Sequence, residues 1–305
     1  MVFDQKVGPG QYPAVPDNEY HAAEMPDNSC LSDMLVSPAH CRWNLDHGRE
    51  PTPSMKLGTA LHLLVLEPDA FNGRDCAAPG CEASTKNGKR CSRTASVCRE
   101  GEWFCSQHDS GGDTLDGPEI VDNKFLETVW GMKESLYANN QIRPLLEGDW
   151  PREMSVVFND PDTEIKCKAR VDLMRPDLGA LIDLKTVRYG GAAERMFAHS
   201  VYRFGYHRQA AFYLHALGCL DQAQYSDFGW IVVETEPPYA CTFRELGTRA
   251  LELGREHVLP LLEKYADCDE TGEWPAYPIS DDPLEFHPWM TTQITDDILS
   301  LIEPR

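Results

Sequence analysis

The sequence lacks the features of membrane and secreted proteins. None of its apolar runs reaches the roughly 18 residues needed to cross a bilayer; the longest, Leu61–Leu66, fits a buried core segment. The first twenty residues contain neither a basic start nor a hydrophobic stretch, so they do not resemble a secretory signal. The sequence also has no internal repeat. We therefore expect a cytoplasmic protein that makes no membrane contact.

Basic residues are scarce, because 28 Lys and Arg face 49 Asp and Glu for a net charge of −21. Phosphate contacts come from Lys and Arg, so this balance at first argues against a nucleic-acid partner. The charge is unevenly distributed, however. Lys185–Arg208 and Thr85–Arg99 are basic, whereas Ala266–Arg305 is strongly acidic. A locally basic face on an acidic body is compatible with DNA binding, although chance scatter of solvated charge gives the same pattern.

Cysteine is abundant, with 11 residues, and five of them fall between Cys76 and Cys105. This stretch is poor in aliphatic residues, so we expect bound metal rather than a hydrophobic core to hold it together. Its spacing C-x9-C-x13-C-x2-H suits tetrahedral zinc and resembles a small zinc-binding module of phage and bacterial proteins. The predicted ligands are Cys81, Cys91, Cys105 and His108. Cys76 or Cys98 could replace one of them, and an iron–sulfur cluster is the alternative.

The periodicity of the remaining sequence predicts an α/β (α+β) fold, a mixed central sheet flanked by helices. Helices are expected at Ser32–Leu45 (broken at Ser37-Pro38), Ser54–Glu67, Ile120–Leu146, Tyr202–Leu217 and Thr242–Tyr265. Strands are expected at Glu153–Phe158, Ile165–Met174, Gly179–Thr186 and Phe228–Glu234. The main domain would comprise residues 31–72 and 118–280. A lead-in of little regular structure (1–30), the Cys-rich insertion (73–117) and an acidic tail (281–305) complete the chain.

Two carboxylates and a lysine converge in the predicted sheet. Asp183 and Lys185 are two apart on one strand, so their side chains leave the same face, and a hairpin can bring Asp172 alongside Asp183. Paired carboxylates suit Mg²⁺ or Mn²⁺, and a neighbouring lysine can position a nucleophilic water. An isolated Asp-x-Lys is more often a surface ion pair, so the neighbouring motifs decide between these interpretations.

Those motifs occur in an order that resembles the PD-(D/E)xK nuclease superfamily, and within it the RecE-type (exonuclease VIII-like) phage recombination exonucleases. They are Ser37-Pro38-Ala39, Leu57–His62, Leu66-Glu67-Pro68, Glu153, Ala169–Asp172, Ile182–Thr186, Tyr206–Tyr213 and Trp274–Tyr277. Each motif is weak alone, but the ordered set covers nearly the whole chain outside the Cys-rich insertion. The resemblance implies a nuclease core with a catalytic Mg²⁺ or Mn²⁺.

The resemblance also assigns roles to individual residues. Asp172 and Asp183 would bind the metal, the Leu184 carbonyl could contribute, and Lys185 would orient the water. His62 would complete the metal site, unless it is simply a packed core histidine. Gln209 and Tyr213, neighbours on one helical face, would align the DNA, although Tyr213 could be plain core. The candidates for supporting roles are Glu67 and Glu153, and those for phosphate contacts are Arg42, Arg170, Arg188 and Arg208.

The activity implied by the resemblance is Mg²⁺-dependent exodeoxyribonuclease action on double-stranded DNA ends, 5′ to 3′, in phage or prophage recombination. The same core also serves endonucleases of restriction or repair, and a non-catalytic DNA-end-binding module is a further alternative. The resemblance further implies a ring-shaped homo-oligomer and a single-strand annealing protein as partner. The acidic tail would either bind a partner or aid solubility.

Overall fold

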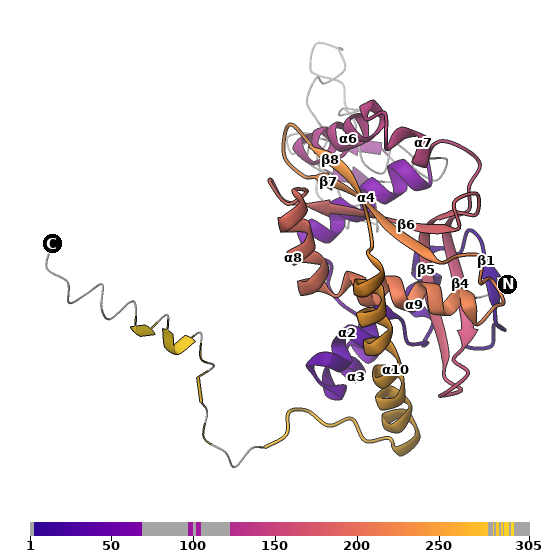
Figure 1. The fold of residues 1–305 in the computed structure, drawn as a ribbon. Coiled ribbons are helices and arrows are strands. Elements are labelled where there is room, and N and C mark those ends of the chain that lie inside the picture. The colour runs from indigo at the N-terminus through magenta and orange to yellow at the C-terminus, as the bar shows by residue number, and fades with distance from the viewer. Residues whose placement is uncertain are drawn as a thin grey trace, which may run out of the picture.

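A six-stranded mixed sheet forms the centre of the molecule (Figure 1). The computed structural model describes residues 3–68 and 123–279, the backbone of 97–99 and 102–104, and single positions between 283 and 295. The strands, in spatial order, are β1 (Gly10–Tyr12), β4 (Arg152–Asn159), β5 (Lys166–Arg175), β6 (Ala180–Val187), β7 (Asp227–Glu234) and β8 (Cys241–Glu245). Only β6 and β7 run parallel; the other neighbouring pairs of this sheet are antiparallel. The predicted mixed sheet is thus confirmed.

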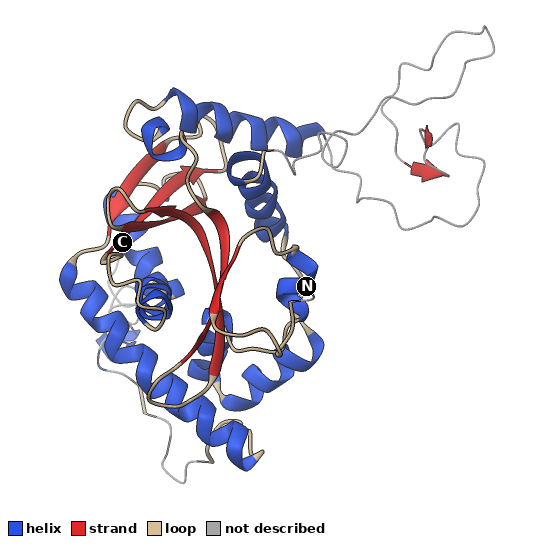
Figure 2. Ribbon diagram, turned by 90° about the vertical axis from the view of Figure 1, so that its right-hand side faces the viewer, coloured by secondary structure: helices blue, strands red, loops and turns tan. Residues whose placement is uncertain are grey.

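Helices cover both faces of the sheet (Figure 2). One face packs against α2 (Asn28–Val36), α3 (Pro38–His47), α9 (Tyr206–Gly218) and α10 (Thr248–Thr271). The other packs against α4 (Pro53–Leu66), α6 (Asn123–Ala138) and α7 (Arg143–Leu146). Along β7, Trp230 and Val232 join the first core and Ile231 and Val233 the second. This alternation explains why β7 is apolar from Trp230 to Val233. No helix in the described ranges is long and apolar enough to span a bilayer.

Side-chain caps fix the starts of the first helices. Asp27, Ser37 and Thr52 each accept a hydrogen bond from a backbone amide three residues further along, at the starts of α2, α3 and α4. Pro38 and Pro53 follow at the first helical position, where a missing N–H costs nothing. The predicted break at Ser37-Pro38 is therefore confirmed as the junction of α2 and α3. A disulfide between Cys30 and Cys41 joins the same two helices.

Four predictions about individual segments are wrong. The helix expected at Ile120–Leu146 is divided into α6 and α7 by a turn, in which Asn139 Oδ1 accepts hydrogen bonds from the Gln141 and Ile142 amides. The lead-in contains β1 and α1 (Asp17–Ala22), and β1 pairs with β4, where tertiary contacts stabilise elements too short for a sequence signal. Thr242 lies in β8, and the helix expected to start there begins at Thr248. The helix expected from Tyr202 is interrupted at Gly205, whose left-handed φ of 68° separates α8 (Glu194–Phe204) from α9.

The Cys-rich insertion lies mostly outside the described residues. Within it the structure gives only the backbone of β2 (Val97–Arg99) and β3 (Glu102–Phe104), which pair antiparallel. The predicted zinc ligands Cys81, Cys91, Cys105 and His108 all fall outside the described part.

Candidate metal centre and cleft

The site lies where β5 and β6 separate. The two strands pair from Leu173 opposite Ile182 to Arg175 opposite Ala180, and the next position in this register would set Asp172 opposite Asp183. There the Leu184 amide donates to Asp172 Oδ2 at 2.8 Å instead of to the neighbouring backbone. Both aspartates are buried, with 8% and 1% of their surface exposed. The predicted hairpin thus brings the two carboxylates together.

Three side chains from three elements converge beside this opening. His62 of α4, Glu153 of β4 and Asp172 of β5 offer ligand atoms that all lie within 4.8 Å of one another. His62 Nε2 lies 2.8 Å from the Leu184 carbonyl oxygen and 3.7 Å from Asp172 Oδ2. Its Nδ1 lies 3.3 Å from Glu153 Oε1. One imidazole, two carboxylates and one carbonyl make a mainly oxygen donor set that fits a divalent cation such as Mg²⁺ or Mn²⁺.

Glu153 is held in an unusual backbone conformation. Its φ of 45° lies in the left-handed region, which a non-glycine residue enters at a cost of about 1–3 kcal/mol. Such strain persists only where the surrounding structure enforces it, and it is concentrated at functional sites. The sequence predicts only a supporting role for Glu153, whereas the structure sets its carboxylate within the group of possible ligands.

The second part of the site is the Asp183–Lys185 pair with its partners on α9. Lys185 Nζ lies 2.8 Å from Asp183 Oδ2 and 4.8 Å from the centre of the Tyr206 ring. Gln209 Nε2 donates to Asp183 Oδ1 at 3.0 Å and lies 3.1 Å from the Tyr213 hydroxyl. The four predicted residues of this part therefore lie together, and Asp183 contacts Lys185 and Gln209 next to the group formed by His62, Glu153 and Asp172.

Burial and mutual repulsion shift the proton affinities of the acidic groups. Burial raises the pKa of Asp183 to about 6, and the negative charge of Asp172 adds to the rise while Lys185 opposes it. Burial also raises the pKa of Asp172. Burial alone would lower the pKa of His62, but the carboxylates of Asp172 and Glu153 raise it to about 9. The carboxylates of this site therefore stabilise positive charge, which here is the proton on His62. A bound metal cation would supply that positive charge and displace the proton.

Of the four arginines predicted to contact phosphate, two line the cleft and two do not. Arg42 pairs with Asp46 on α3, and Arg208 is buried and donates to Ser32 Oγ; neither lines the cleft above the metal group. Arg170 lines the cleft, but it pairs with Asp17 and lies over the Tyr20 ring. Arg188 is exposed and lines the cleft. Glu67, predicted to have a supporting role, also lines the cleft.

This cleft has a volume of about 1260 Å³ and contains cations that no motif identified. These cations are Arg195 and Arg203 of α8, and His199 of the same helix lines the cleft between them. The basic density of the Lys185–Arg208 stretch was the only sequence signal for them. It could not separate these residues from the buried Arg208.

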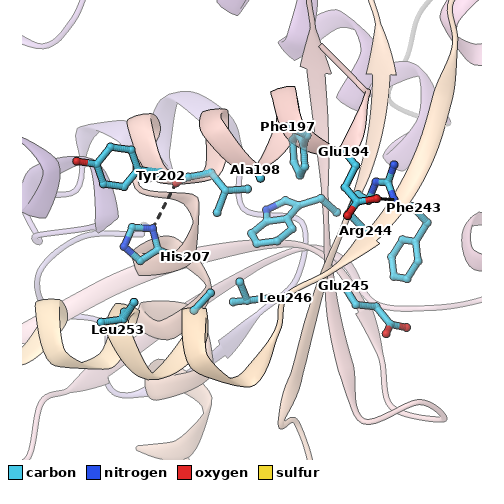
Figure 3. A pocket seen from close by; sticks show the side chains of 13 residues that line it. Glu194, Phe197, Ala198, Tyr202, His207, Phe243, Arg244, Glu245, Leu246 and Leu253 are labelled. Carbon is cyan, nitrogen blue, oxygen red and sulfur yellow. Dashed lines mark hydrogen bonds and ion pairs between the residues drawn. The ribbon is translucent and has the colours of Figure 1, made fainter. Parts of the chain in front are cut away.

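A second, smaller pocket lies on the other side of α8 (Figure 3). It has a volume of about 700 Å³ and is lined mainly by apolar side chains of α8, β8 and α10, with Phe197 and Trp230 among them. Glu194 and Arg244 form an ion pair of 3.7 Å at its edge. It contains none of the metal-binding candidates, so α8 separates an apolar pocket from the charged cleft.

Comparison with known proteins gives a family and a shared fold. The model of a family described as "PDDEXK-like domain of unknown function (DUF3799)" matches residues 28–280. The structure of a presumed exonuclease from Eubacterium rectale superposes with a TM-score of 0.55 at 12% identity, covering 92% of this chain and 95% of that one. A phage-related exonuclease from Haemophilus somnus 129PT gives a TM-score of 0.31 at 12% identity, covering 52% and 78% of the two chains. No curated protein matches.

Proposed function

The chain belongs to the family of PDDEXK-like domains, and on that premise we propose that it is a metal-dependent nuclease that hydrolyses DNA from its ends. One observation carries the proposal: the His62, Glu153 and Asp172 group lies beside a buried Asp183–Lys185 pair at the floor of an open cleft. A cation site next to an ammonium group is suited to phosphodiester hydrolysis.

The side chains divide the chemistry between them. His62, Glu153 and Asp172, with the Leu184 carbonyl, would hold Mg²⁺ or Mn²⁺, and Asp183 would add its carboxylate. When bound, the cation supplies Lewis-acid activation of water and neutralises phosphate charge. Lys185 orients the attacking water and offsets the negative charge that develops on the phosphate. Gln209 and Tyr213 hold Asp183 toward the lysine and line the path of the DNA.

The finer details of the proposal rest on the motif resemblance to RecE-type enzymes. We propose digestion of double-stranded DNA from the 5′ end in recombination, by a ring-shaped homo-oligomer working with a single-strand annealing protein. We also propose that Cys81, Cys91, Cys105 and His108 bind a structural zinc ion, because three thiolates and one imidazole suit it.

The test compares linear and covalently closed circular duplex of one sequence with Mg²⁺ or Mn²⁺. An exonuclease degrades the linear DNA and leaves the circle intact; cleavage of both would support the endonuclease alternative. Asp183→Ala should abolish the digestion. Asp227→Ala, the same change at an exposed position at the start of the adjacent strand β7, should not. No cleavage of either substrate with either metal would overturn the proposal.

A further inference from the structure

Helix α8 presents two arginines and a histidine to the cleft. Arg195, His199 and Arg203 are four residues apart, so they lie on one face, with about 6 Å of helix rise between successive members. All three are exposed and line the cleft. Neither arginine forms an ion pair with a carboxylate of the described residues. Arg188, just before the helix, also lines the cleft, and like Arg195 and Arg203 it has no carboxylate partner within the described part of the chain.

The part of the cleft lining that comes from α1, the start of α2 and the end of α4 has the reverse charge. Its acids are Asp17, Asp27 and Glu67. Arg170 also lines the cleft and pairs with Asp17, whereas Asp27 and Glu67 form no ion pair among the described residues. The cleft is therefore asymmetric: the side formed by α8 attracts phosphate, and the part with Asp27 and Glu67 repels it.

An aromatic side chain continues the basic row toward the catalytic lysine. Phe204, at the end of α8, is 55% exposed and lines the cleft. Its ring lies 5.7 Å from that of Tyr206, which in turn lies 4.8 Å from Lys185 Nζ. Cations beside an exposed ring are the combination by which proteins hold a single strand, because phosphates bind the cations and a base stacks on the ring.

We infer that α8 is the strand-guiding element of the enzyme. Arg195, His199 and Arg203 hold the phosphate backbone of one DNA strand, and Phe204 stacks a base as this strand approaches Lys185. A duplex would bring its second phosphate backbone toward Asp27 and Glu67, so the cleft favours a single strand separated from its complement. This inference rests on the proposed function and deepens it by naming the form in which the DNA enters.

The test measures DNA binding apart from cleavage. The affinities of a single-stranded oligonucleotide and of a blunt hairpin duplex are measured by fluorescence anisotropy in EDTA over a range of salt concentrations. The variant is Arg195→Gln combined with Arg203→Gln. The matched control is Arg249→Gln combined with Arg255→Gln, an equal change of charge on α10, at positions that do not line the cleft.

The wild type should bind the single strand more tightly than the duplex. The α8 variant should lose at least tenfold in single-strand affinity, and its slope of log affinity against log salt should be less negative by about 1.4, since each lost contact contributes about 0.7. The control should change neither. An equal loss in both variants, no loss in the α8 variant, or tighter binding of the duplex would overturn the inference. Because cleavage of linear DNA is measured separately, failure of the proposed function would be recognised independently.

Discussion

Two regions of the cleft are built in opposite ways. The floor consists of the metal-binding group and its neighbours (His62, Glu153, Asp172, Asp183, Lys185, Gln209 and Tyr213), and the wall consists of α8. On the floor, the functional side chains come from several elements, α4, β4, β5, β6 and α9, and contact their neighbours, as His62 does with Glu153 and Asp172. The wall is an eleven-residue helix with a single buried side chain, Phe197, which packs against Trp230. Chemistry that needs fixed distances is thus placed on the packed core, while contacts to a variable strand are placed on a lightly anchored surface helix.

The largest expected effect comes from removing the ammonium group of the floor. Lys185→Met keeps the length of the side chain but removes the charge that would orient the water, so the rate of digestion should fall by about 10²–10³-fold. Affinity for single-stranded DNA, measured by anisotropy in EDTA, should change far less, because the α8 wall is intact.

The converse experiment changes the arginines of the wall and leaves the floor intact. Arg195→Gln combined with Arg203→Gln should weaken binding while largely sparing the rate at saturating DNA. A loss of rate at saturation as large as that of Lys185→Met would show that wall and floor do not divide binding from chemistry.

Metal binding separates the two regions in a second way. His62→Ala removes a ligand candidate from the floor and should weaken Mn²⁺ binding by about 10–100-fold, the range known for disturbed metal sites. Isothermal titration calorimetry measures this directly. The matched control is His199→Ala, a histidine that lines the same cleft from α8 and should leave Mn²⁺ affinity unchanged. Equal losses in the two variants would place the ion elsewhere.

Without bound metal, the protein should have a lower free energy of unfolding at neutral pH than at acid pH, because of Asp183 on the floor. The pKa of Asp183 is about 6 in the folded protein against about 3.9 for an unfolded aspartate. The folded state therefore binds more protons between about pH 4 and pH 6, and its free energy of unfolding falls across this window as pH rises, by roughly 1–3 kcal/mol.

Urea denaturation in EDTA at pH 4.5 and pH 7 measures this loss. Asp183→Asn should reduce the difference between the two pH values, because the amide does not titrate. Glu263→Gln, an exposed acid of α10, is the control. An unchanged pH dependence in Asp183→Asn would contradict the assigned shift.

The division between floor and wall also explains what the sequence could predict. The hairpin of β4 and β5, the Asp-x-Lys strand and the Gln209–Tyr213 spacing are local patterns, and the structure brings these residues together as expected. The position of Glu153 depends on a left-handed backbone enforced by its surroundings, and no local pattern indicates it. Whether an arginine faces the cleft, as Arg195 does, or is buried, as Arg208 is, depends on tertiary packing alone.

The smallest effect should come from changing Gly205, which connects α8 of the wall to α9 of the floor. Gly205 has a φ of 68°, and an added Cβ would lie 2.5 Å from Arg208 Nη2. Gly205→Ala should therefore cost about 1 kcal/mol or somewhat more in thermal unfolding, and it should displace α8 enough to weaken single-strand binding a few-fold. Mn²⁺ affinity should not change, because the ligand candidates lie on α4, β4, β5 and β6. Gly218→Ala, where a Cβ meets nothing within 4 Å, is the control. If Gly205→Ala weakened metal binding as much as DNA binding, the wall and the floor would have to be regarded as one unit.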